Sequence, residues 1–203
     1  MKERPILFSG PMVRAILAGR KTQTRRVAIK TSQPDNVYIT DFDAEQSMIE
    51  IENKHLGARY WKQCPYGQPG DRLWVRENGW ERPERTAKMM REGADTWPQY
   101  TYAADNWSNQ DRADFKAWGF RNRPSIHMPR WASRILLEIV DIRIEKLQDI
   151  SEADAEAEGP PKNFNLWRDN FCALWQQING GGSWDTNPWV WVVEFKRLQG
   201  INP

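Results

Sequence analysis

Apolar positions along this chain follow helical spacing in some segments and strand alternation in others. Val13, Ile16 and Leu17 share one helical face, with Pro11 suited to the first turn and Gly19 to the cap, which predicts a short helix. Alternation predicts strands over residues 24–29, 72–77, 99–103, 134–147 and 189–198. The two periods together indicate a mixed helix and strand fold.

The strand over 134–147 changes its apolar side partway along. Apolar residues occupy odd positions up to Ile139 and even positions from Val140 onward. A regular strand would therefore turn its core face to water. A β-bulge near Ile139 and Val140 resolves the conflict, and bulges bend strands into closed barrels.

Two helices are predicted between this strand and the last one. The first begins at Ser151, the N-cap of a capping box with Asp154, and ends at Gly159. The second places large apolar residues at spacings of three and four from Phe164 to Ile178. We interpret these side chains as core contacts rather than ligand contacts.

Two polar, irregular segments, 30–69 and 78–124, interrupt the regular pattern. The first has only a short alternating piece around residues 47–51, and the second holds eight aromatic residues. We interpret both as insertions. The remaining elements favour a single α+β domain over residues 1–203, built on a small β-barrel with flanking helices.

Composition narrows the class of protein. A hydrophobic content of 39% with 12 Trp among 203 residues argues against disorder. Without an apolar run long enough for a membrane span or a signal peptide, we expect a cytoplasmic protein that does not contact a membrane. The spacing of Cys64, Cys172, His55 and His127 suggests neither a disulfide nor a metal site, and no cofactor is expected.

Positive charge is concentrated near the N-terminus. Residues 1–30 carry a net charge of +7, whereas the whole chain carries +2. Arg20, Lys21, Arg25 and Arg26 follow the first helix within seven positions. They either attract an anionic ligand or compensate the helix dipole on a solvated surface.

Four segments together resemble the ASCH domain family, which has the PUA-like β-barrel fold. They are residues 16–26 (I-L-A-G-R-K-T-x-T-x-R), 70–77, 155–159 and 190–198. The segment 125–134 and the Trp-rich tail resemble the longer ASCH proteins encoded by phages and prophages. The resemblance implies a PUA-like barrel and leaves the two insertions outside the match.

The resemblance implies RNA binding or, in some members, hydrolysis of the amide of N4-acetylcytidine. The amidohydrolase set would be Lys21 as base, Thr24 as nucleophile and Glu158 orienting the lysine, with Lys21 and Thr24 outside the core. A lysine can deprotonate a threonine if burial or nearby cations lower its pKa from about 10.4. Glu158 is otherwise a solvated acid at the end of an acidic helix.

Other residues are candidate ligand contacts. They are Arg20, Arg25, Arg26 and Arg130 on phosphates, Trp74 and Arg76 on one strand face, and His127 as a general acid or a structural hydrogen-bonding group. The expected partner is RNA or a nucleobase-containing small molecule. The alternatives are a ribonuclease and a non-catalytic module for single-stranded nucleic acid, and the sequence does not determine an oligomeric state.

Overall fold

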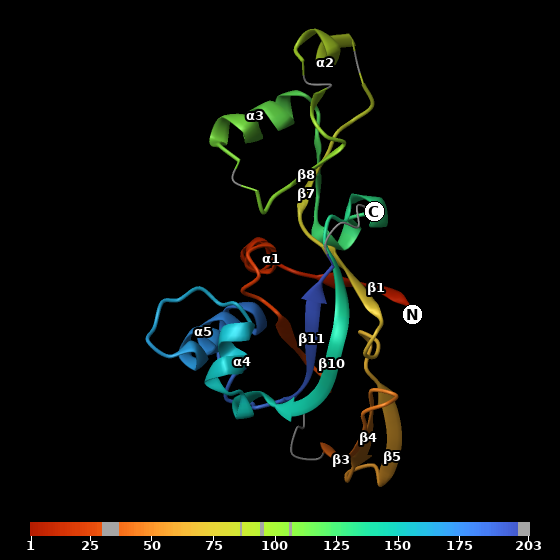
Figure 1. The fold of residues 1–203 in the computed structure, drawn as a ribbon. Coiled ribbons are helices and arrows are strands. Elements are labelled where there is room, and N and C mark those ends of the chain that lie inside the picture. Colours follow the sequence, from red (N-terminus) through yellow and green to blue (C-terminus); the bar gives the residue numbers. More distant parts are fainter. Residues whose placement is uncertain (30–36, 86, 94–95, 106, 199–203) are drawn as a thin grey trace.

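A five-stranded sheet forms the centre of the molecule (Figure 1). The computed structural model describes residues 1–29, 37–85, 87–93, 96–105 and 107–198. The central strands are, in sheet order, β1 (Glu3–Leu7), β6 (Arg72–Arg76), β10 (Leu136–Lys146), β11 (Trp189–Arg197) and β2 (Gln23–Val27). β1 runs parallel to β6, and the other neighbours are antiparallel. The mixed helix and strand class is confirmed.

The sheets of the described chain do not close into a barrel, so the PUA-like barrel is not confirmed. The edge strands β1 and β2 are nevertheless linked by α1 (Gly10–Leu17), the helix predicted from its apolar face. The Arg26 guanidinium donates a hydrogen bond to the Leu7 carbonyl at 2.7 Å and lies 5.4 Å from the centre of the Phe8 ring. A side chain, and not a ladder of strand hydrogen bonds, therefore connects the two edges.

The predicted bulge is present in β10. Its pairing with β11 shifts register between Ile139 and Asp141. Ile139 and Ile142 are consequently both buried, while Val140 is 51% exposed. Figure 1 shows β10 as a long curved strand beside β11.

The sheet has an apolar core on each face. One core gathers side chains from α1 and the strands, including Val13, Ile16, Val75, Ile142 and Trp191. The other lies beneath α4 (Glu152–Ala157) and α5 (Trp167–Asn179), and includes Ala155, Phe171, Trp175, Val190 and Val192. The prediction of core contacts along α5 holds for Phe171 and Trp175, whereas Phe164 and Ile178 are half exposed.

The segments predicted as irregular contain regular structure, which corrects the sequence analysis. The first forms an antiparallel sheet of β3 (Val37–Asp43), β4 (Met48–Asn53) and β5 (Ala58–Gln63). The second contains β7 (Gly79–Glu81), α2 (Ala87–Arg91), β8 (Tyr100–Tyr102), α3 (Asn109–Ala117) and β9 (Arg121–Arg123). The two lie at opposite ends of the central sheet (Figure 1).

Three short 3₁₀ helices complete the described elements: η3 (Ser125–His127), η4 (Arg130–Ala132) and η5 (Leu147–Asp149). Among the described residues, no helix has both the length and the apolar character needed to cross a membrane. Nor do these residues bring three His, Cys, Asp or Glu side chains together as metal ligands.

Candidate functional site

Lys21 is buried, contrary to the expectation that it lies outside the core. It follows α1, and its side chain is fully enclosed. Its Nζ donates hydrogen bonds to the Gln23 carbonyl at 2.8 Å, to the Glu158 carbonyl at 2.8 Å and to Glu158 Oε2 at 2.7 Å. All three ammonium protons therefore have an acceptor, and Lys21 and Glu158 form a buried ion pair.

The end of α4 is shaped to accept Lys21. Glu158 is the C-cap residue, and Gly159 follows with a φ of +67°. A Cβ at Gly159 would lie only 2.9 Å from the Lys21 Cβ. The Thr22 amide also donates to the Ala157 carbonyl at 2.9 Å. The glycine permits a close approach that any other residue would obstruct.

The surroundings of Lys21 shift its pKa. Burial is the largest effect and lowers the pKa of the ammonium below its usual value, since charge is poorly solvated in the interior. The Glu158 carboxylate opposes this shift, while Arg26 and Arg25 add to it by repulsion. Lys21 is therefore closer to deprotonation than a surface lysine.

Arg25 lies beside the Lys21 and Glu158 ion pair, and we call these three residues and the side chains that pair with them the buried cluster. Its side chain is fully buried, and its guanidinium lies 3.4 Å from Glu158 Oε1, 3.0 Å from Glu145 Oε2 and 3.5 Å from Asp154 Oδ2. The two oxygens of Glu158 thus face two different cations. Arg25, expected to contact ligand phosphates, is enclosed and surrounded by three carboxylates.

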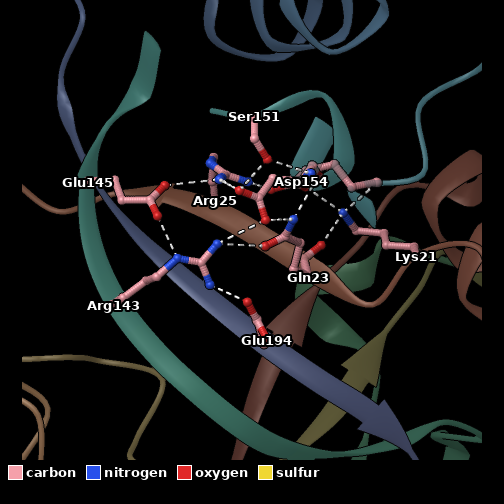
Figure 2. Close-up of polar contacts among 9 residues, drawn as sticks. Lys21, Gln23, Arg25, Arg143, Glu145, Ser151, Asp154 and Glu194 are labelled. Carbon is pink, nitrogen blue, oxygen red and sulfur yellow. Dashed lines mark hydrogen bonds and ion pairs between the residues drawn. The ribbon is translucent and has the colours of Figure 1, made fainter. Parts of the chain in front are cut away.

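A second layer of polar contacts extends this cluster across the sheet (Figure 2). Arg143 binds Glu145 at 2.5 Å and Asp154 at 3.0 Å, and it also pairs with Glu194. Gln23 donates to Asp154 Oδ1 at 2.9 Å. Burial opposes ionisation of Asp154, but hydrogen bonds from Gln23 and Ser151 and the charges of Arg143 and Arg25 outweigh it and lower its pKa. Acids thus neutralise both arginines beneath α4.

Thr24 is also buried, again contrary to expectation, and it borders a small cavity of about 50 Å³ at the edge strand β2. Glu158, Arg25 and Arg26 line the same cavity, together with apolar side chains of α1 and α5. Such a cavity holds roughly four waters, or one small functional group of a ligand. Glu158 joins the parts of the site, because it pairs with Lys21 and lines the cavity beside Thr24.

The remaining predicted residues lie in other places. The guanidinium groups of Arg76 and Arg130 lie over the Trp74 ring, 4.7 Å and 5.8 Å from its centre. Arg20 is exposed just after α1, and His127 is exposed in η3. The structure therefore brings some candidates together around Lys21 and others around Trp74, and it leaves Arg20 and His127 outside both groups.

Several residues of the buried cluster were not identified from the sequence. The sequence identified Asp154 only as part of the helix cap. That cap is present, since the Asp154 amide donates a hydrogen bond to Ser151 Oγ at 3.1 Å. Arg143 and Glu145 are two positions apart on β10 and therefore point to the same face of the strand. This spacing could have indicated a charged face. Phe8, whose ring centre is 5.6 Å from the Lys21 Nζ, gave no such signal.

Comparisons with known proteins add no relative to this description: no family model, curated protein or solved structure matches the chain.

Proposed function

We propose that this chain is an ASCH-type amidohydrolase that acts on an N4-acylated cytidine or a closely related nucleobase amide. One observation carries the proposal: Glu158, the buried ion-pair partner of Lys21, lines a small cavity that Thr24 also lines. A lysine with a lowered pKa, a hydroxyl and an orienting carboxylate are the groups that amide cleavage by a threonine requires. The resemblance to the ASCH family assigns the same three residues.

The reaction would proceed in two stages. Lys21, after releasing one proton to water, takes the Thr24 hydroxyl proton while Oγ1 attacks the acyl carbonyl carbon. The bond between that carbon and the exocyclic nitrogen then breaks, the nitrogen receives the proton from Lys21, and an ester remains on Thr24. Water hydrolyses the ester, which releases the carboxylic acid and restores the hydroxyl.

The cavity size agrees with this assignment. About 50 Å³ accommodates an acyl amide but not a whole nucleoside. The ring and sugar would remain outside the cavity. Arg25 also lines the cavity, but its guanidinium is held by three carboxylates, so its role would be to hold Glu158 in place.

Release of cytidine from N4-acetylcytidine, followed by chromatography, tests the proposal. We expect Thr24→Ala to lower kcat by at least about a thousandfold, since it removes the nucleophile. Lys21→Met should lower kcat by about 10²–10⁴-fold. Thr22→Ala is the matched control, because Thr22 is exposed two positions away, and it should stay within about twofold of the parent. A parent protein without turnover, or equal turnover in the Thr24→Ala variant, would contradict the proposal.

A further inference from the structure

The indole of Trp175 has a hydrogen-bond donor that the described part of the chain leaves unused. Trp175 lies on α5 and is only 5% exposed. Its Nε1 is buried, and among the described residues it has no acceptor. Buried donors in native proteins nearly always have an acceptor, and the indole has no second polar group. An acceptor from solvent or from a ligand therefore completes this donor.

Trp175 lines the same cavity as Thr24 and Glu158. Its ring packs against Phe171, with the two ring centres 6.0 Å apart. The Arg25 guanidinium lies 6.0 Å from the centre of the Phe171 ring and 3.4 Å from Glu158 Oε1. The indole therefore belongs to the wall of the cavity that the proposed nucleophile shares.

The arginines that line this cavity differ from the indole. The Nε atoms of Arg25 and Arg26 are also buried without an acceptor among the described residues, but so are those of Arg72 and Arg76, which do not line the cavity. In Arg25 and Arg26 other guanidinium nitrogens do have acceptors, namely carboxylates for Arg25 and the Leu7 carbonyl for Arg26. The indole has a single donor, and that donor is the one left unused.

Trp191 provides a comparison within the same protein. Its Nε1 is likewise buried without an acceptor in the described chain. Trp191 belongs to the core on the other face of the sheet, however, and it does not line the cavity. The two indoles thus share an unused donor and differ in their access to the cavity.

Apolar side chains make up much of the cavity wall around Trp175. They are Met12, Val27, Phe171, Leu174 and Ile178. A hydrogen bond is stronger in such surroundings than in water, because the local dielectric constant is low. A fixed donor in a site of this kind acts most strongly on an oxygen atom that gains negative charge.

We infer that Trp175 Nε1 donates a hydrogen bond to the carbonyl oxygen of the acyl group that enters the cavity. When Thr24 Oγ1 adds to the carbonyl carbon, negative charge develops on this oxygen, and the indole N–H stabilises that charge. Trp175 is therefore a catalytic residue as well as a core contact of α5. Its role in the reaction rests on the proposed function, whereas the carbonyl site does not.

Proton–nitrogen NMR spectra of the parent protein, titrated with N-methylacetamide, test the carbonyl site. Each indole N–H gives one signal, and scalar coupling to its own backbone assigns that signal to a residue. We expect the Trp175 signal to move downfield and to saturate, because its proton gains a carbonyl acceptor, while the Trp191 signal stays in place. A Trp175 signal that does not move, or two signals that move alike, would overturn the inference.

Turnover of N4-acetylcytidine tests the role of the indole in the reaction. Trp175→Phe keeps an aromatic ring and removes the donor, so it should lower kcat by about 10²–10³-fold with little change in KM. Trp191→Phe is the matched control and should keep the kcat of the parent. Urea denaturation of both variants checks that each one folds. Equal losses of kcat in the two variants would overturn the catalytic role.

The outcomes also separate the two proposals. Turnover by Trp175→Phe at the rate of the parent would overturn the inference and leave the proposed function intact. A parent protein that releases no cytidine, but whose Trp175 signal still saturates with N-methylacetamide, would support the carbonyl site and contradict the proposed function.

Discussion

At the scale of single residues, the pair of Lys21 and Glu158 dominates the energetics of the site. Both side chains are almost completely buried, and the ammonium makes three hydrogen bonds. Desolvation of two charges is costly, so each charge depends on the presence of the other. Loss of one partner leaves an uncompensated charge in the interior.

Lys21→Met and Glu158→Gln should each lower the free energy of unfolding by about 3–5 kcal/mol. The double variant should lose less than the sum, because it leaves no unpaired charge. Urea denaturation of the four proteins measures the coupling. The exposed pair of Lys196 and Glu138 provides the control cycle, with a coupling of about 0–1 kcal/mol. Additive losses at the buried pair would contradict the argument.

The sequence could name this pair only through the family resemblance. Lys21 and Glu158 are 137 residues apart, and no local pattern relates them. The expectation that Lys21 and Thr24 lie outside the core was wrong. It was made because charged and polar residues after a short helix usually face solvent. Burial of a lysine depends on its distant carboxylate partner, which only the tertiary structure reveals.

At the scale of elements, a side-chain clamp adds to the strand pairing that holds β1 against β6. Asp71, before β6, accepts a hydrogen bond from the Lys2 amide at 2.6 Å and one from the Arg4 guanidinium at 2.7 Å. A glycine is favoured at position 67 beside them, because the Cβ of any other residue would lie 2.6 Å from the Arg4 Nη1. The clamp fixes the edge strand that carries Leu7.

Asp71→Asn should make stability less sensitive to acid. Burial of Asp71 opposes its ionisation, but the hydrogen bonds from Lys2 and Arg4 outweigh burial and lower its pKa below the usual 3.8. An acid with a lowered pKa stabilises the fold above its unfolded pKa, and this stability is lost as pH falls through the folded pKa. Urea midpoints between about pH 7 and pH 2 should therefore show a gap between parent and variant that closes in acid. A gap between parent and Asp71→Asn that stays constant over this pH range would contradict the assignment.

Local sequence patterns predicted some elements and not others. α1, α5 and the bulge of β10 were predictable because each has a periodic apolar face. β5 was not predicted, because five of its six residues are exposed and no alternation results. β7 and β9 have three residues each, too few for a periodicity to emerge.

At the scale of the whole molecule, the two insertions differ in whether they share a hydrophobic core with the central sheet. Ile49 and Ile51 of β4 belong to the same core as the central sheet. The second insertion has a core of its own, around Phe115 and Phe120. We expect the first insertion to unfold with the centre and the second to open separately.

Arg134→Met should loosen only the second insertion. Arg134 binds the buried Glu77 at 2.9 Å and Asp105 of the insertion at 2.8 Å, so it connects the two parts. Burial raises the pKa of Glu77 against the effect of Arg134, and without that arginine the carboxylate would be unpaired. Hydrogen exchange should accelerate over residues 79–123 and remain unchanged over 37–63. Arg123→Met, which removes an ion pair within the insertion, should have a smaller effect, and uniform acceleration would contradict the picture.

The place of β11 between β10 and β2 has a consequence for biosynthesis. A ribosome releases Arg25 and Thr24 long before Val192 and Val193, their register partners on β11. Until those residues emerge, the nascent chain holds β2 without β11, its one strand neighbour in the described part of the chain, and leaves the charges beneath α4 open to water. Premature termination before β11 should therefore yield a product that chaperones retain and proteases remove.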